Sequence, residues 1–328
     1  MGPVTVIGGV NVDINGFSLA PLNMADSNPG TVEYCPGGVG RNIAENLHRL
    51  GAEVRLISVI GDDWAGDLLR ASSRDMGLNI EHSLFLPGTS PVYIALMDNT
   101  GEMRLALADM SILDKMSCEH LESKADLIAK STVVVLDTNL PEAIIRFVLD
   151  RFGSGGNCGK TAGPLFFLDP VSARKSAKVS SLTGRFDALK LGRMEAAFLS
   201  GTDIPECTGT DKRNPGLLTK LEEAADSLIR RGTGRVFITL GKGGVYFAQA
   251  DKRFFTPVKQ VQPVNTSGGG DAFMAGMVYG TLHGWEPERI VPFAMAMAAI
   301  TVQSKTTVSR NLNVELVEKT VKSYNDKA

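Results

Sequence analysis

The strongest chemical feature of the sequence is a run of glycines that opens a helix and is followed at once by a carboxylate. Gly268, Gly269 and Gly270 precede Asp271, and a stretch of small residues begins at Ala272. The N–H groups of consecutive glycines can converge on an anion, and a helix N-terminus adds partial positive charge. A carboxylate at the mouth of such a pocket can accept the proton of an alcohol. The segment therefore suits phosphoryl transfer, although the same residues could merely cap a helix and turn the chain.

Polar residues also stand beside glycines near the N-terminus. Asn11 and Asp13 follow the first strand-like run, and open α/β folds bind ligands at the carboxyl edge of the sheet. Gly38, Gly40 and Asn42 open a helix, where the backbone can approach a ligand and an amide can both donate and accept. A carboxylate and an amide so placed could hold the hydroxyls of a sugar. Each could equally be an ordinary turn or helix-entry residue.

Other glycine-containing segments carry weaker signals. Thr239, Gly241 and Gly244 end another predicted strand and would let a ring or a phosphate approach the main chain, but the pattern is also typical of a hairpin turn. Residues 153–161 superficially match a P-loop, yet Ser154 stands at the first glycine position and the segment follows a helix. The sequence has no complete GxGxxG, and its histidines lack zinc-ligand spacing.

The composition indicates a globular protein without a general attraction for polyanions. The chain has 328 residues, of which 43% are hydrophobic and 21% charged, and its formal net charge is −2. Nucleic acid and membrane surfaces are therefore not expected partners. The longest apolar run, residues 291–302, is shorter than the roughly 20 residues of a membrane span and is expected to be a buried helix. No signal peptide is visible and no CxxC pair occurs, so we expect a cytoplasmic location and reduced thiols at Cys35, Cys118, Cys158 and Cys207.

Short apolar strands alternate with helical segments along the chain. This alternation predicts a mostly parallel sheet with right-handed crossovers and helices on both faces. The predicted strands are 4–7, 54–59, 133–136, 165–168, 189–191 and 236–240. The predicted helices are 40–50, 64–76, 141–152, 194–199, 215–231, 272–283 and 287–303.

Two stretches interrupt the alternation, at about 12–35 and 91–107. In the second, two strand-like runs flank the turn at 98–101, which is a hairpin signal. Extra strands inserted early in an α/β chain predict a small sheet that stands beside the main one and covers a cleft as a lid. The alternative is an extension of the main sheet. We expect one domain over residues 1–328, with this lid inserted in it.

Taken together, the motifs resemble those of the ribokinase-like, phosphofructokinase-B family of sugar and nucleoside kinases. The glycine cluster before Asn42 and the Gly-Asp step at 270–271 occur in the family's order, and the resemblance covers nearly the whole chain. It implies a small sugar or nucleoside as the acceptor, ATP and Mg²⁺ as cofactors, a β-sheet lid, and often a homodimer formed through that lid.

The resemblance also implies roles for individual residues. Asp271 would be the base that deprotonates the acceptor hydroxyl, and Gly268, Gly269 and Gly270 would form the anion hole. The residues that would hold the ribose-like part of the acceptor are Asn11, Asp13, Gly38, Gly40 and Asn42. The residues that would contact ATP are Lys190, Thr239, Gly241, Gly244, Gly268 and Gly270, with the C-terminal helices closing the other side.

Within the family, the likeness is closest to pseudouridine kinases. It rests on the lid segment 25–30, the hairpin segment 98–103, and Asp169-Pro170-Val171-Ser172 followed by Lys175. Asn28 and Asn139 are candidate partners for the base because an amide can donate and accept, although both could be turn residues. The implied reaction is transfer of the γ-phosphoryl group of ATP to the 5′-hydroxyl of pseudouridine.

The chain departs from the family pattern at two positions. The family often has Asn-x-x-Glu near the metal and phosphates, whereas here Gly192 replaces the amide and Glu195 remains, so Glu195 would organise Mg²⁺ through water. The position before the anion hole is frequently Asp where a monovalent cation binds, but here it is Asn265. The loss of that negative charge makes potassium activation doubtful.

Three other functions remain open at this stage. A kinase for ribose, adenosine or a ketose phosphate would share every core residue. A non-catalytic nucleoside-binding regulatory protein would share the fold, but the intact Asp271 and glycine run disfavour it. A dinucleotide-dependent oxidoreductase would lack its phosphate fingerprint.

Overall fold

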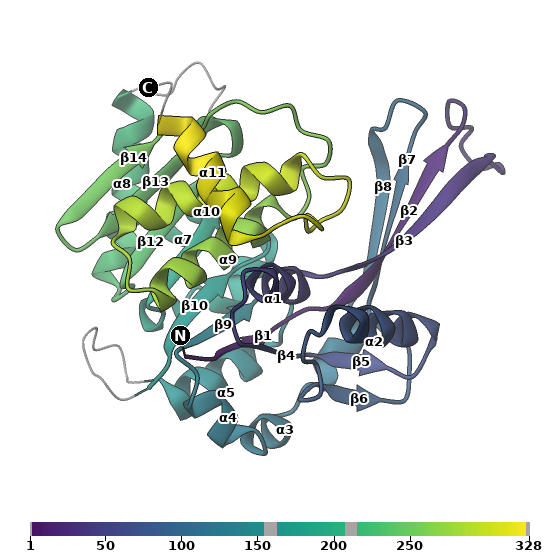
Figure 1. The fold of residues 1–328 in the computed structure, drawn as a ribbon, viewed down its shortest axis with the longest axis horizontal. Coiled ribbons are helices and arrows are strands. Elements are labelled where there is room, and N and C mark those ends of the chain that lie inside the picture. Colours follow the sequence, from purple (N-terminus) through teal and green to yellow (C-terminus); the bar gives the residue numbers. More distant parts are fainter. Residues whose placement is uncertain (1, 154–162, 207–214, 326–328) are drawn as a thin grey trace.

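A mostly parallel sheet runs through the body of the molecule (Figure 1). The computed structural model describes residues 2–153, 163–206 and 215–325. The strand order is β14-β13-β12-β11-β10-β9-β1-β4, and only the pairs β12–β13 and β13–β14 are antiparallel. The strands of this sheet are β1 (Val4–Ile7), β4 (Val54–Ile57), β9 (Val133–Asp137), β10 (Leu165–Asp169), β11 (Ala188–Gly192), β12 (Arg235–Thr239), β13 (Val245–Gln249) and β14 (Lys252–Thr256).

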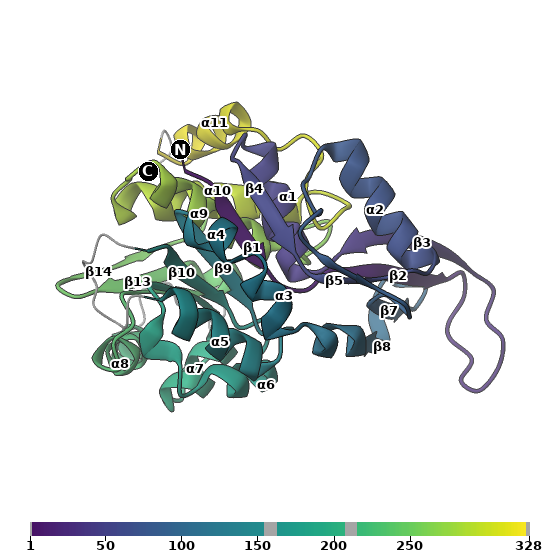
Figure 2. The same ribbon diagram turned by 90° about the horizontal axis from the view of Figure 1, so that it is seen from below.

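Helices cover both faces of this sheet, as Figure 2 shows from below. One face packs against α1 (Val39–Arg49), α9 (Gly269–Leu282), α10 (Pro287–Val302) and α11 (Val314–Asn325). The other packs against α5 (Glu142–Phe152), α7 (Arg193–Ser200) and α8 (Pro215–Arg230). Shorter helices α3 (Cys118–Glu122), α4 (Ala125–Ala129) and α6 (Ala173–Ser176) lie on the α5 side.

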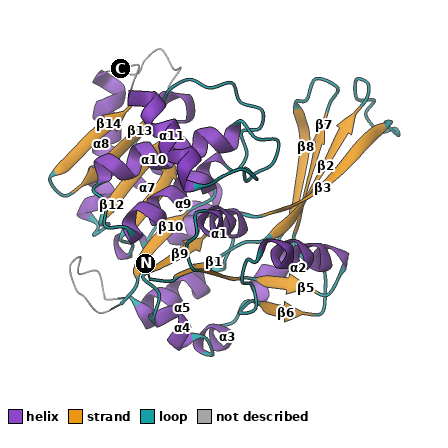
Figure 3. Cartoon of the chain, viewed as in Figure 1, coloured by secondary structure: helices purple, strands orange, loops and turns teal. Residues whose placement is uncertain are grey.

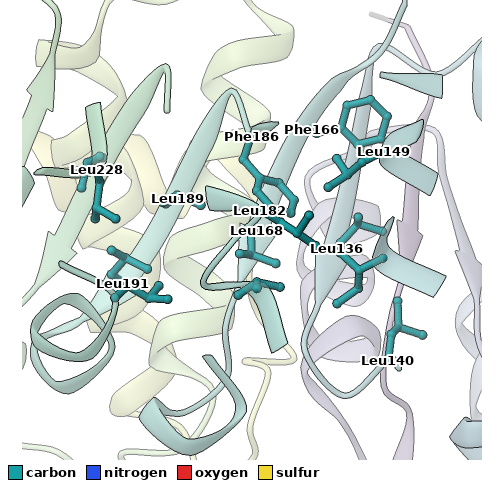
Figure 4. Packing of buried hydrophobic residues seen from close by; sticks show 14 of the residues in the cluster. Leu136, Leu140, Leu149, Phe166, Leu168, Leu182, Phe186, Leu189, Leu191 and Leu228 are labelled. Atoms are coloured by element: carbon teal, nitrogen blue, oxygen red, sulfur yellow. The ribbon is translucent and has the colours of Figure 1, made fainter. Parts of the chain in front are cut away.

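The strands are apolar at every position because each of their faces is buried. In β9, Val134 and Leu136 join the cluster under α5, whereas Val133 and Val135 join the cluster under α9. Side chains alternate across a strand, so a strand between two helical layers needs an unbroken apolar run. Figure 4 shows the first of these clusters, in which leucines of β9, β10 and β11 pack beside Leu149 and Phe186.

A four-stranded sheet stands apart from the body, at the right of Figure 3. Its order is β3-β2-β7-β8, and its strands are β2 (Asn11–Ser18), β3 (Gly30–Gly37), β7 (Val92–Met97) and β8 (Met103–Asp109). The prediction of a separate small sheet is therefore confirmed, and the alternative of an extended main sheet is wrong. Helix α2 (Trp64–Met76) packs against the base of this sheet.

The predicted single strand at 54–59 is wrong. The chain leaves the main sheet after Ile57, and β5 (Val59–Gly61) pairs with β6 (Leu84–Leu86) in a two-stranded sheet. The break falls at Ser58, which is buried and whose N–H donates to the Ser83 hydroxyl instead of continuing the first ladder. The other predicted strands and helices are present, with ends that differ by up to three residues.

Three further predictions concern a membrane span, the cysteines and the glycine-rich segment. None of the helices in the described ranges has the length and hydrophobicity that a membrane span requires. Cys35 and Cys118 are free thiols. Cys158, Cys207 and most of the glycine-rich segment 153–161 lie outside the described residues.

Candidate active site

Asp271 lies in the first turn of α9, at the carboxyl edge of the main sheet. The helix begins at Gly269, not at Ala272 as predicted, so the glycine run forms the N-terminal turn itself. The first N–H groups of a helix have no partner within it, and they point out of the N-terminus with partial positive charge. Asp271 is buried beside these donors. The arrangement is that of an anion-binding turn with a carboxylate next to it.

Gly268 is required at the start of this turn for two reasons. Its φ is +80°, in the left-handed region, and a Cβ there would collide with the carbonyl oxygen of Thr307. Thr307 belongs to the loop that follows α10. The anion-binding turn is thus packed directly against that loop.

A buried ion pair lies beneath the turn. Lys190 Nζ in β11 is 2.6 Å from Asp169 Oδ2 at the end of β10, and a Cβ on Gly270 would lie 3.0 Å from the same nitrogen. Burial opposes the charge of Lys190, but Asp169 and Asp271 together raise its pKa above the ordinary value. The ammonium group therefore remains a cation close to the place where an anion would sit.

The electrostatic surroundings of Asp271 favour its protonated form. Burial, followed by the negative charge of Asp169, raises the pKa of Asp271 to about 7, while Lys190 and a hydrogen bond from Asn42 act in the opposite direction. A carboxyl group that titrates near neutral pH can accept a proton and later release it. Asp137, at the end of β9, also has its pKa raised, to about 6, chiefly by burial.

Asn42 connects Asp271 to the other predicted acceptor residues. Its Nδ2 donates to Asp271 Oδ2 at 2.8 Å. At the start of the same helix, Gly38 has a φ of +99° and packs against Gly9, and Gly40 packs against Gly8. These glycines bring α1 into contact with the turn that follows β1.

Asp13 and Asn11 lie on β2, where the small sheet joins the body. Asn11 Nδ2 donates to Asp13 Oδ1 at 2.6 Å. Burial raises the pKa of Asp13, while the bond from Asn11 and the charge of Arg41 lower it. The other oxygen, Oδ2, packs against Gly37, and a carboxylate oxygen can accept from a sugar hydroxyl.

Asn139 lies at the same sheet edge as Asp137 and is bound to Lys175. Lys175 Nζ donates to Asn139 Oδ1 at 2.5 Å, and the Asn139 side chain packs against Gly9. Val171 adopts a φ of +61°, which is strained for a β-branched residue. This bend after β10 directs α6, and with it Lys175, back over the sheet edge.

Asn28 occupies a different environment, in the loop between β2 and β3. Its Oδ1 accepts from the Asn23 N–H, and its Nδ2 donates to the carbonyls of Asn23 and Asp26. Asn28 therefore makes the bonds of a turn residue, which is the alternative interpretation given for it above.

Four of the six residues predicted to contact ATP line one cavity of about 260 Å³, whereas Gly268 and Lys190 do not. Thr239, Gly241, Gly244 and Gly270 line it, and η4 (Gly241–Gly243) forms the expected hairpin turn between β12 and β13. Lys190 is not among the lining residues but lies directly under Gly270. The rest of the wall is mostly apolar, so the cavity suits a planar ring next to an anion-binding turn. The lining residues that the sequence analysis did not identify include Lys242, Val258, Phe273, Met295 and Val302.

Glu195 lies in the first turn of α7, beside a second hollow of about 280 Å³ that shares Thr239 and Gly241 with the first. A Cβ at Gly192 would collide with the Glu195 carboxylate, so the glycine makes room for that carboxylate. Glu206 also lines the hollow. Carboxylate oxygens are the donors that Mg²⁺ prefers. Among the described residues no group of three or more His, Cys, Asp or Glu side chains could hold a metal ion by itself, so an ion here would also need phosphate or water ligands.

Comparisons with known proteins identify the family of the chain. A family model described as pfkB family carbohydrate kinase matches residues 1–313. The pseudouridine kinase of Escherichia coli strain K12 is 32% identical over 314 residues, which cover 95% of this chain and 94% of that protein. The guanosine-inosine kinase of Exiguobacterium acetylicum is 26% identical over 315 residues, which cover 93% of this chain and 95% of that protein.

A solved structure shows the same fold. The ribokinase of Thermotoga maritima is similar with a TM-score of 0.81 at 21% identity, covering 98% of this chain and 100% of that one. The predicted ribokinase-like fold is therefore confirmed. Kinases of this family use ATP. With the family model matching nearly its whole length, the chain belongs to the pfkB family of carbohydrate kinases and transfers a phosphoryl group to a hydroxyl of a small sugar or nucleoside.

Proposed function

We propose that the protein phosphorylates the 5′-hydroxyl of pseudouridine, with ATP as the donor and Asp271 as the base. The observation that carries the proposal is the position of Asp271. It stands between the acceptor-side amide of Asn42 and the glycine turn that borders the 260 Å³ cavity. A base in that place can take the proton of an alcohol at the moment when the alcohol attacks a phosphoryl group on the glycine turn.

The reaction is an in-line displacement. The acceptor oxygen forms a bond to the γ-phosphorus, the bond from that phosphorus to the β,γ-bridging oxygen breaks, ADP leaves, and the proton goes to Asp271. The N–H groups at the start of α9 and the Lys190 ammonium face the charge that develops on the transferring group. Mg²⁺ would be held by the ATP phosphates and, through water, by Glu195, and it would neutralise phosphate charge.

Two features support pseudouridine as the acceptor. The relative with 32% identity over nearly the whole chain is a pseudouridine kinase. At the sheet edge, Asn139 and Lys175 present an amide and an ammonium next to the acceptor-side turn at Gly9, and these groups suit the carbonyl and N–H edges of a uracil ring. The alternative is another sugar or nucleoside, since the guanosine-inosine kinase is also similar.

We also propose that the small sheet closes over the acceptor and forms a homodimer. The strand register places Asp13 on one face, and the opposite face carries exposed apolar side chains at Val32, Tyr34, Leu96, Leu105 and Leu107. An apolar sheet face of this kind suits a second copy of itself. A monomeric mass in solution would contradict the dimer.

Potassium activation is not part of the proposal. The Nδ2 of Asn265 donates to the Lys305 carbonyl at 3.2 Å, so an amide N–H already binds an oxygen that a cation could have used. Equal rates with sodium and with potassium are expected.

The deciding experiment is a substrate panel. The purified protein is incubated with ATP, Mg²⁺ and either pseudouridine, uridine, adenosine, ribose or fructose 6-phosphate, and products are identified by mass. Preference for pseudouridine supports the proposal, and preference for another acceptor replaces the substrate while keeping the Asp271 mechanism. Asp271→Asn is the control, because it should lose most turnover and still bind the nucleoside. Normal turnover by Asp271→Asn would refute the assigned base.

A further inference from the structure

Thr307 lies where the loop after α10 passes over the active site. Its Oγ1 donates to Asn42 Oδ1 at 3.3 Å, and Asn42 Nδ2 donates in turn to Asp271 Oδ2 at 2.8 Å. The carbonyl oxygen of Thr307 also packs against Gly268. One residue of this loop therefore touches both the anion-binding turn and the amide that faces the base.

The chemistry of the three groups fixes the direction of this chain of hydrogen bonds. An ionised carboxylate only accepts, so the amide of Asn42 must turn its N–H₂ toward Asp271. Its Oδ1 then faces Thr307 and needs a donor. The main chain of Asn42 is held separately, because its N–H donates to the Gly38 carbonyl and its carbonyl accepts from Asn46 Nδ2. These bonds fix the helix but not the rotation of the Asn42 amide.

We propose that Thr307 is a positioning residue for the phosphoryl transfer: its hydroxyl holds the Asn42 amide in the orientation that donates to Asp271. The proposal rests on the proposed function, because it takes Asp271 as the base. Donation to the amide oxygen polarises the amide and strengthens its N–H as a donor. Without the hydroxyl, the amide can turn its oxygen toward the carboxylate, which disfavours the ionised base.

The other groups around Asp271 belong to different elements. Burial favours the protonated carboxyl most, and Asp169 from β10 and Asp137 from β9 act in the same direction, whereas Lys190 from β11 favours the ion. Within the described part of the chain, Thr307 makes no hydrogen bond to these groups, and it reaches Asp271 through the Asn42 side chain on α1. A change at Thr307 should therefore alter the contribution of Asn42 and leave these charges in place.

The test compares the pH dependence of kcat/KM for Thr307→Val, Thr307→Ser and the wild type, with the acceptor that the wild type phosphorylates fastest. Valine keeps the shape and removes the hydroxyl, and serine keeps the hydroxyl. We expect the acidic limb of the Thr307→Val profile to move upward by about half a pH unit or more, since one net hydrogen bond is lost. Below the limb, its rate should be several-fold lower than that of the wild type. Thr307→Ser should follow the wild type.

Thr306→Val is the matched control. It removes a hydroxyl that bonds to the Val308 carbonyl and to the Ser304 hydroxyl in the same loop, and in the described structure this hydroxyl makes no hydrogen bond to Asn42. Its limb should stay in place. A Thr307→Val limb at the wild-type pH, or a Thr307→Ser limb displaced as far as that of valine, would overturn the proposal. A wild-type profile with no acidic limb, or an active Asp271→Asn, would instead overturn the assignment of the base.

Discussion

Lys190 and Asp169 form a buried ion pair whose Nζ and Oδ2 atoms are 2.6 Å apart. The pair belongs to neighbouring parallel strands, and it lies under the turn that begins at Gly268. Both charges act on Asp271, with opposite signs. With Asp271 as the proposed base, the pH dependence of turnover should therefore respond to two residues that need not touch the acceptor.

Asp169→Asn should shift the acidic limb of kcat/KM to lower pH. The negative charge of Asp169 raises the pKa of Asp271, so its removal lowers that pKa and keeps the base ionised in more acidic solution. Lys190→Met should shift the limb the other way, because it removes the cation. Both profiles are measured with saturating ATP. Limbs that move in the same direction in the two variants would contradict this account.

Asp271→Asn should be more stable than the wild type at neutral pH, although it should lose most turnover. The pKa of this carboxyl is raised to about 7 in the folded protein, whereas the unfolded chain has a value of about 3.9. Between pH values of about 3.9 and about 7, the Asp271 carboxyl has released its proton in the unfolded chain but keeps it in the folded protein. The free energy of unfolding of the wild type therefore falls as the pH rises through this range. The melting temperatures should agree near pH 4 and differ by several degrees at pH 8. A constant difference across this range would show that the charge is not the cause.

Alanine at Gly270 and at Gly268 should have different effects. A Cβ at Gly270 meets only the end of the Lys190 side chain, so Gly270→Ala should fold normally and lose turnover with ATP. A Cβ at Gly268 meets the Thr307 carbonyl at a φ of +80°, so Gly268→Ala should lower the melting temperature as well. Thermal melts and ATP-dependent turnover of the two variants provide the comparison. Equal stability of the two variants would argue against the contact with Thr307.

Local signals in the sequence predicted much of the fold. The helix at 64–76 has its predicted ends because Asp63 caps the first turn and Gly77 adopts the left-handed conformation after the last. The glycine run before Asp271 likewise predicts a helix start, and α9 begins within that run, at Gly269. In each case, the residues that determine the structure are neighbours in the chain.

Long-range contacts could not be predicted in this way. Asn42 and Asp271 are 229 positions apart, and Thr307 contacts Asn42 from a loop that carries no recognisable motif. Some residues of α10, such as Met295, line the cavity next to the glycine turn. The sequence predicts only a buried helix there, because the spacing of its apolar residues is that of any buried helix. The packing of α10 beside β13 makes one face of this helix part of the cavity wall.

Asn139→Ala should reduce kcat/KM for pseudouridine by about tenfold or more, while that for ribose stays within about twofold, because one or two hydrogen bonds to the base would be lost. The Asn139 amide accepts from Lys175, so its truncation also frees that ammonium group. Lys175→Met therefore serves as the companion variant and should be similarly selective. Asn28→Ala is the matched control, since its amide is bound within its own loop. Equal losses for pseudouridine and ribose in Asn139→Ala would place this residue at the sugar instead of the base.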